Sequence, residues 1–172
     1  TGDFYGGPRP GNNLFGESLV ALDLETGQRK WHYQFVHHGI WDHDNPSPPI
    51  LADVQFKGKR VPMVAQPSKQ AFLYVLNRET GEPIWPINEK PVEKGTVPGE
   101  WYAPTQPFPS APPAYEIQGV DESVLIDYTP ELHKEALDII KKYKTGPIFT
   151  PPVESLSLIH ISEPTRRTGI SY

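Results

Sequence analysis

The chain has 172 residues, of which 37% are hydrophobic and 11% aromatic, and can bury a single core of ordinary size. The net charge of −5 provides no basic surface for nucleic acid, and the absence of cysteine excludes disulfides and thiolate metal sites. No apolar run approaches the ~18 residues that span a membrane. Proline is the outlier: nine of the 21 prolines fall between Pro83 and Pro113, which predicts one long irregular segment.

Short runs with strand chemistry alternate with turns in the first half of the chain. Residues 18–23 form an apolar run, and residues 30–35 alternate as a second strand. Residues 49–54 and 61–65 predict two more short strands, and residues 71–77 predict a fifth. The fold class predicted from these runs is all-β.

The first of these hairpins recurs further along the chain. Asp23 aligns with Asn77, Gly27 with Gly81 and Trp31 with Trp85, each pair 54 residues apart, and both copies contain a Glu-Thr-Gly turn. A period near 50 built of short strands, a turn and a tryptophan is typical of β-propeller blades. In such a unit glycine supplies the positive φ of the turn, and tryptophan covers the gap between neighbouring sheets.

The second half of the chain departs from this pattern. Residues 86–128 are rich in proline and carry aromatic residues without a period, and loops of this length are usually functional. A helix is expected next, with Thr129 as N-cap and Pro130 in its first turn. Its buried stripe is predicted to be Leu132, Ala136, Ile140 and Tyr143, and Gly146-Pro147 to stop it. Residues 86–147 thus form a proline-rich and helical insertion within a propeller domain of residues 1–155.

The end of the chain has a different character. Residues 156–172 share no pattern with what precedes them and resemble the translation of a transposase-type sequencing-library adapter. We expect this tail to be non-native, and the native sequence to break off near Ser155.

The stretch with the most chemistry is residues 36–49, which holds three histidines, two aspartates, a tryptophan and three prolines. Because proline fixes φ and removes a donor, this stretch is predicted to be a stiff loop that leaves a strand. Loops on a sheet scaffold commonly carry site residues. Asp42 in this loop and Lys69, 27 positions later, are the main candidates.

Several motifs in order resemble the pyrroloquinoline quinone (PQQ) dehydrogenases, especially the glucose dehydrogenase branch. The resemblance covers nearly all of residues 1–154. The motifs are Arg9-Pro10-Gly11-Asn12-Asn13, the first repeat with Trp31, His37-His38-x-x-Trp41-Asp42-x-Asp44, Gln66-Pro67-x-Lys69, Pro104-Thr105-Gln106-Pro107-Phe108 and Gly146-Pro147-Ile148-Phe149-Thr150-Pro151-Pro152.

The resemblance implies an eight-bladed β-propeller, of which this chain supplies about two blades, with PQQ and a divalent cation (Ca²⁺, or Mg²⁺) near its axis. Asp42 matches the family's catalytic aspartate and is also the expected metal ligand. Lys69 matches the lysine that contacts the quinone, and Trp41 is expected to line the cofactor site. A carboxylate can take a hydroxyl proton, and an ammonium can stabilise charge that develops on the quinone.

The function implied by the resemblance is oxidation of a sugar or alcohol by hydride transfer to the quinone. Electrons would pass to ubiquinone or a cytochrome, in the periplasm or on the periplasmic face of the inner membrane. Any membrane attachment would lie in parts absent here, and the chain alone is expected to be inactive.

Two other interpretations of the same residues stay open. In one, His37, His38, Asp42 and Asp44 form the site of a metal-dependent hydrolase, since clustered His and Asp can bind zinc or manganese. In the other, the propeller is a non-catalytic binding or assembly scaffold, which would explain the blade tryptophans but gives no reason for the Trp-Asp-x-Asp loop.

Overall fold

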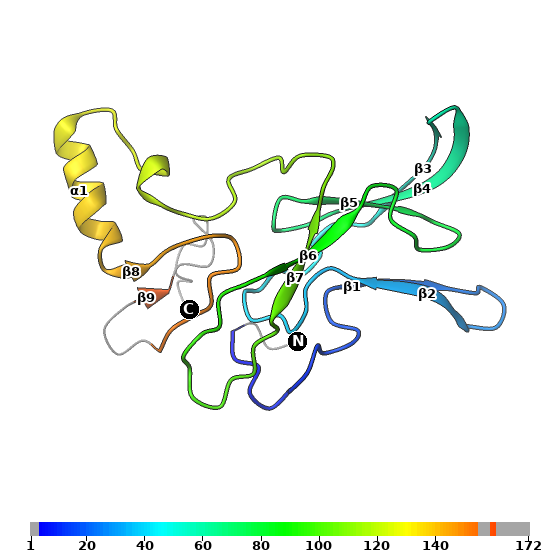
Figure 1. Cartoon of the computed structure of the whole chain (residues 1–172), viewed down its shortest axis with the longest axis horizontal. Helices are drawn as coiled ribbons and strands as arrows, with labels where there is room; N and C mark the ends of the chain where they lie inside the picture. Colours follow the sequence, from blue (N-terminus) through cyan, green and yellow to red (C-terminus); the bar gives the residue numbers. More distant parts are fainter. Residues whose placement is uncertain (1–3, 155–158, 161–172) are drawn as a thin grey trace, which may run out of the picture.

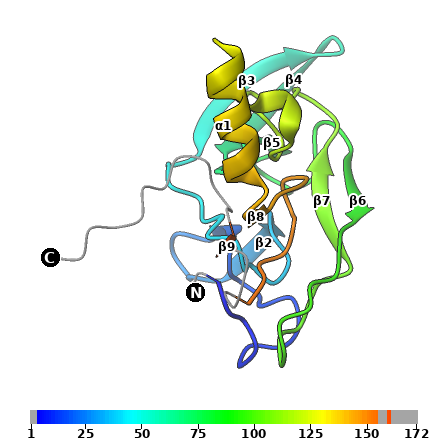
Figure 2. The same cartoon turned by 90° about the vertical axis from the view of Figure 1, so that its left-hand side faces the viewer.

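The computed structural model describes residues 4–154 and the backbone of residues 159–160. Within these residues the chain forms four small sheets and one α-helix, arranged along one long axis (Figure 1). The hairpins of residues 18–34 and 50–67 extend toward one end, and the helix stands at the other, where it is nearest the viewer in Figure 2. The described residues contain no helix that is long and apolar enough to cross a membrane.

Three of the four sheets are antiparallel, and only the last pair is parallel. The first hairpin and the central sheet confirm the strands predicted in the first half of the chain. The first sheet pairs β1 (Ser18–Leu22) with β2 (Arg29–Gln34); the central sheet has the order β3 (Ile50–Phe56), β4 (Lys59–Pro67), β5 (Leu73–Asn77); the third pairs β6 (Ile87–Pro91) with β7 (Thr105–Pro109); the last pairs β8 (Tyr143–Lys144) with β9 (Ile159–His160).

The core lies where β4 and β5 meet the loop that follows β2. Its buried members are Phe35, Val36, Ile40, Trp41, Val64, Phe72, Tyr74, Leu76 and Phe149. Tyr74 is fully buried, and burial raises the pKa of its phenol well above the usual value. Its hydroxyl is nevertheless paired, because it donates to the carbonyl of Pro107 at 3.1 Å.

The repeat predicted from the sequence is visible in how the first two sheets meet. Trp31 on β2 donates from Nε1 to the carbonyl of Arg78, directly after β5, at 3.0 Å. Its indole covers Gly81, where a Cβ would lie 2.8 Å from the ring. The second tryptophan, Trp85, packs edge-on against Phe56 with ring centroids 5.3 Å apart. The tryptophan of the first unit therefore joins its sheet to the turn of the next unit, as predicted.

The two Glu-Thr-Gly turns are built alike. Asp23 Oδ1 accepts from the backbone N–H of Thr26 at 3.0 Å, and Asn77 Oδ1 accepts from that of Thr80 at 3.3 Å. Lys30, together with the donors of Thr26, lowers the pKa of Asp23 to about 2. Since an unfolded aspartate has a pKa near 3.9, the stability from this turn is present above that pH and is lost as the pH falls toward 2.

The proline-rich segment contains one pair of strands that the sequence analysis missed. β6 and β7 pair antiparallel from Ile87↔Pro109 to Pro91↔Thr105. Proline is tolerated in an edge strand, where its missing N–H removes no ladder hydrogen bond. A search for alternating strand residues does not recognise β6 and β7, because prolines interrupt the pattern in both strands.

The helix α1 (Pro130–Ile140) begins as predicted, because Thr129 accepts from the N–H of Leu132 and Pro130 opens the first turn. The predicted buried stripe is only partly correct: Ile140 is buried, whereas Leu132 is 40% exposed. The helix also ends at Ile140, before the predicted stop at Gly146. The two-residue strand β8 begins shortly after the helix and redirects the chain.

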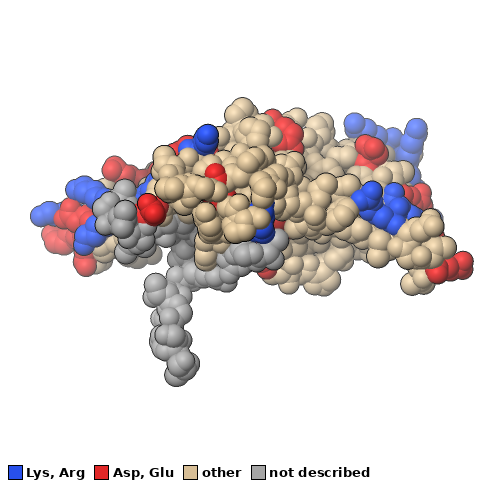
Figure 3. All heavy atoms as spheres, turned by 90° about the horizontal axis from the view of Figure 1, so that it is seen from below, with Lys and Arg blue, Asp and Glu red and all other residues tan. Residues whose placement is uncertain are grey.

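One face of the molecule carries charges of both signs. On the face seen in Figure 3, acidic and basic side chains lie close together toward the two ends, and the middle is mostly uncharged.

The contact between Trp31 and Gly81 yields a stability prediction. Gly81 has φ +78° and no room for a Cβ, whereas Gly27 has φ +69° with nothing within 4 Å of one. Gly81→Ala should therefore lower the free energy of unfolding by about 2–4 kcal/mol, and Gly27→Ala by only about 1 kcal/mol. Denaturant unfolding of the two variants measures the difference, and equal losses would contradict the proposed packing of Trp31 on Gly81.

Candidate active site

The loop after β2 is buried over most of its first half. The chain leaves β2 at Gln34 and at once places Phe35, Val36, Ile40 and Trp41 in the core. The loop was predicted to be stiff from its prolines, and the burial of these side chains is a second restraint on its backbone. Asp42 follows directly, at the end of the buried part.

Trp41 is held on three sides. Its Nε1 donates to the carbonyl of Thr150 at 2.7 Å, its ring stacks on His43 with centroids 6.0 Å apart, and Phe149 meets it edge-on at 5.3 Å. Only 3% of Trp41 is exposed. Trp41 thus anchors the backbone beside Asp42, and its contact with a cofactor stays a prediction.

Asp42 has a left-handed backbone, with φ +58°. Aspartate tolerates this region better than most residues, and such conformations are concentrated at functional sites. The side chain of Asp42 is 9% exposed, and its Oδ2 lies 3.2 Å from Nζ of Lys69. Lys69 also donates to the backbone carbonyl of Asp42 at 2.7 Å. The structure therefore brings together the two residues that the sequence singled out.

Lys69 reaches a second carboxylate in the same loop. Its Nζ donates to Oδ1 of Asp44 at 2.8 Å. The hydrogen bond and charge of Lys69 outweigh partial burial and hold the pKa of the Asp44 carboxyl below its usual value. One ammonium thus joins two carboxylates and one carbonyl, while 22% of the Lys69 side chain is still exposed to solvent.

His37 is fixed through its backbone as well as its ring. Gln106 on β7 is fully buried, accepts from the N–H of His37 at 2.8 Å and donates to its carbonyl at 2.7 Å. The ring of His37 contacts Gln34 and Glu89 at 3.2 and 3.0 Å. These contacts tie the start of the loop to β7.

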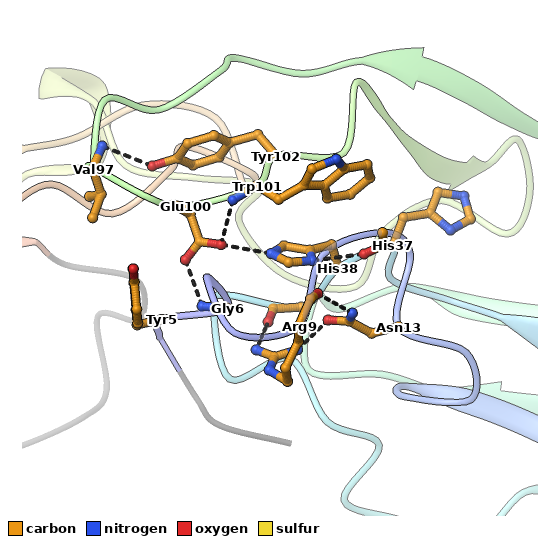
Figure 4. A network of polar contacts seen from close by, with 12 residues as sticks. Tyr5, Gly6, Arg9, Asn13, His37, His38, Val97, Glu100, Trp101 and Tyr102 are labelled. Carbon is orange, nitrogen blue, oxygen red and sulfur yellow. Dashed lines mark hydrogen bonds and ion pairs between the residues drawn. The ribbon is translucent and has the colours of Figure 1, made fainter.

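His38 is the centre of a buried polar network that joins three segments (Figure 4). Its Nδ1 lies 2.8 Å from the carbonyl of Gly11, and its Nε2 lies 2.8 Å from Oε1 of Glu100. Glu100 also accepts from the N–H groups of Gly6 and Trp101, at 2.6 and 2.9 Å. The side chains of His38 and Glu100 are 0% and 2% exposed. This pair therefore holds the loop against the N-terminal segment.

These contacts give no support to the hydrolase interpretation. The rings of His37 and His38 contact Glu89 and Glu100, whereas Asp42 and Asp44 contact Lys69. In the part of the chain that the structure describes, no group of three His, Asp or Glu side chains is placed to hold a metal ion.

The same residues fit part of a cofactor site. Asp42 offers the carboxylate oxygens that a hard cation prefers, and the Lys69 ammonium brings a positive charge that suits anionic or quinone oxygens. A cation bound at Asp42 would require further ligands beyond those that residues 4–154 supply.

A cavity of about 170 Å³ lies nearby but is separate from this pair of residues. Neither Asp42 nor Lys69 lines it, although it shares Phe149 and Thr150 with the surroundings of Trp41. Its lining residues are Pro91, Val92, Glu93, Phe108, Pro147, Phe149 and Thr150.

Comparison with known proteins identifies the family. Residues 1–170 match the sequence model of the PQQ family, described as the beta-propeller domain of glucose, ethanol and alcohol dehydrogenases. The chain belongs to the PQQ-dependent dehydrogenase family. The propeller repeat and the order of motifs found in the sequence agree with this assignment, and the sheets described above are part of a β-propeller. The match includes most of residues 156–172, whose adapter origin stays a prediction and lies almost wholly outside the described residues.

Two relatives are glucose dehydrogenases. The chain is 37% identical over 164 residues to the quinoprotein glucose dehydrogenase of Escherichia coli (strain K12), which covers 92% of this chain and 20% of that protein. It is 45% identical over 110 residues to the quinoprotein glucose dehydrogenase of Gluconobacter oxydans (strain 621H). This match covers 63% of this chain and 14% of that protein. The matched residues thus span 20% of the length of the first relative and 14% of the length of the second.

One solved structure is that of the quinohemoprotein alcohol dehydrogenase from Comamonas testosteroni. It aligns with a TM-score of 0.44 and 36% identity, over 60% of this chain and 15% of that one.

Sequence reasoning missed the partners that fix this PQQ-family loop. Glu100 and Gln106 lie 62 and 69 residues from the histidines that they contact, and Thr150 lies 109 residues from Trp41. Gln106 and Thr150 stand in motifs that carried the family resemblance, but only the fold shows what they contact. The sequence signal that could have pointed to these partners is a polar residue next to a proline or an aromatic residue, as at Glu100, Gln106 and Thr150.

The His38–Glu100 pair should be far more important for stability than the pair of Lys144 and Glu93, in which Glu93 is exposed. Glu100→Leu leaves His38 and two backbone N–H groups without their acceptor, and should lower the free energy of unfolding by about 2–4 kcal/mol. Glu93→Leu, the matched control, should cost less than about 1 kcal/mol because Glu93 is 54% exposed. Similar losses in denaturant unfolding would contradict the structural role of the network.

Proposed function

We propose that the complete protein oxidises a sugar or alcohol hydroxyl with PQQ as cofactor, and that this chain supplies the base Asp42 and the cofactor-binding Lys69. The contact between Lys69 and Asp42 carries this proposal, since it joins the two residues that match the family's motif. The names of the relatives support the substrate class, because they include dehydrogenases of glucose, glycerol and alcohol.

Asp42 is suited to take the hydroxyl proton of the substrate. Its carboxylate is nine-tenths buried and is held by a backbone that Trp41 anchors, so it reaches the substrate with little freedom to move. As the alcohol carbon becomes a carbonyl, it loses a hydride, and the hydroxyl proton passes to Asp42. When bound, PQQ accepts the hydride, and a divalent cation such as Ca²⁺ acts as a Lewis acid.

Lys69 is suited to hold the cofactor and to offset charge. Its ammonium lies between Asp42 and Asp44, and 22% of its side chain is exposed to solvent. An ammonium near the quinone oxygens stabilises negative charge that develops there. We also infer, from the family alone, a ubiquinone or cytochrome acceptor and a periplasmic location.

The test uses the complete protein and artificial-dye reduction with glucose and simple alcohols, with and without PQQ plus calcium. Turnover should require both additions. Asp42→Asn should lower kcat about 10²–10⁴-fold because amide replaces the base, whereas Asp138→Asn, on the exposed side of α1, should leave it unchanged.

Full activity in Asp42→Asn would contradict the assignment of the base. Absence of both turnover and PQQ binding in the wild-type protein would favour a non-catalytic propeller scaffold, in which Asp42 serves only the structure of its loop.

A further inference from the structure

The position of the Lys69 ammonium depends on the tight turn between β4 and β5. The N–H of Ala71 donates to the carbonyl of Ser68 at 3.1 Å and closes the turn. The N–H of Ser68 donates to the carbonyl of Phe72 at 3.0 Å. Ala71 has φ +61°, a left-handed backbone that is uncommon for alanine. Surrounding contacts must hold such a turn in place.

Those contacts come from a segment that the sequence analysis left without a role. Tyr115 Oη donates to the carbonyl of Ser68 at 2.6 Å, and the backbone N–H of Tyr115 donates to the carbonyl of Ala71 at 3.0 Å. Gln118 Nε2 donates to the carbonyl of Gln70 at 2.7 Å. Three of the four carbonyls in residues 68–71 are thus held from outside the sheet, all by residues 115–118.

The sequence separation makes these bonds informative. Residues 115–118 lie more than 40 positions after the turn, in the long segment between β7 and α1. Within that segment they have no regular structure, so local strand or helix pairing does not explain their position. The bonds converge on the turn that carries Lys69, whose side chain reaches Asp42.

We propose that Tyr115 and Gln118 are positioning residues for Lys69. By fixing the carbonyls on either side of Lys69, they hold its ammonium against Asp42 and Asp44. This inference rests on the proposed function of Lys69. A catalytic group displaced by about 1 Å can lose on the order of 10²-fold in rate, so the loss of one such bond should reduce turnover without removing the fold.

The experiment is a double-mutant cycle in the complete protein loaded with PQQ and calcium. Tyr115→Phe removes only the hydroxyl, and Ser68 keeps its bond from Ala71. It should lower kcat about tenfold, with little change in KM for the alcohol. In the Lys69→Ala background the same substitution should have no further effect, because its effect acts through Lys69. Tyr128→Phe, at an 84% exposed tyrosine between β7 and α1, is the matched control and should change nothing.

A second readout does not depend on activity. Competitive acetylation of the cofactor-free protein, followed by mass spectrometry, reports the reactivity of Lys69 relative to exposed Lys141. Tyr115→Phe should raise the relative reactivity of Lys69 severalfold, since its ammonium is held less firmly. If Tyr115→Phe does not fold, Gln118→Met removes the bond to Gln70 and must show the same two effects.

The outcomes separate this inference from the function on which it rests. If Lys69→Ala leaves both turnover and PQQ affinity unchanged, the proposed role of Lys69 is wrong. Two other results would overturn the positioning proposal when Lys69→Ala does impair turnover or PQQ affinity. One is that Tyr115→Phe lowers kcat by the same factor in the Lys69→Ala background as in the wild-type protein. The other is that Tyr115→Phe leaves the acetylation of Lys69 unchanged; in either case Tyr115 and Gln118 are structural only.

Discussion

One ammonium group determines the arrangement of the candidate site. Lys69 contacts a carbonyl and a carboxylate of Asp42 and the carboxylate of Asp44, and so closes the loop after β2 onto the turn between β4 and β5. The positive charge of Lys69 offsets the repulsion between two aspartates that are separated by one residue. The remaining contacts of the loop fix its other parts: Trp41 through Thr150, His37 through Gln106, and His38 through Glu100.

The propeller repeat provides the frame for this loop. Trp31 joins the first sheet to the turn after β5, and the core between them is filled by residues of the loop itself, such as Phe35 and Ile40. The loop is therefore part of the packing between two blades rather than an appendage. This packing explains how a segment without regular hydrogen bonding can keep Asp42 in a left-handed backbone conformation.

Local chemistry in the sequence was sufficient for much of the fold. Strand runs, the two Glu-Thr-Gly turns and the Thr129 cap depend on near neighbours, and the structure confirms them. The pairing of β6 with β7 was not predicted because proline conceals an edge strand. The partners Glu100 and Gln106 were not predicted because their contacts join residues more than 60 positions apart. Asp42 and Lys69 were found through the order of family motifs, since no periodicity relates residues 27 positions apart.

The most direct test of this account is a crystal structure of the complete protein with PQQ and calcium bound. The account predicts that Lys69 keeps its contact with Asp42 and that both side chains contact the bound cofactor or its cation. A structure in which PQQ binds elsewhere, with Lys69 and Asp42 paired only to each other, would show that their contact serves the loop alone and would contradict the central claim.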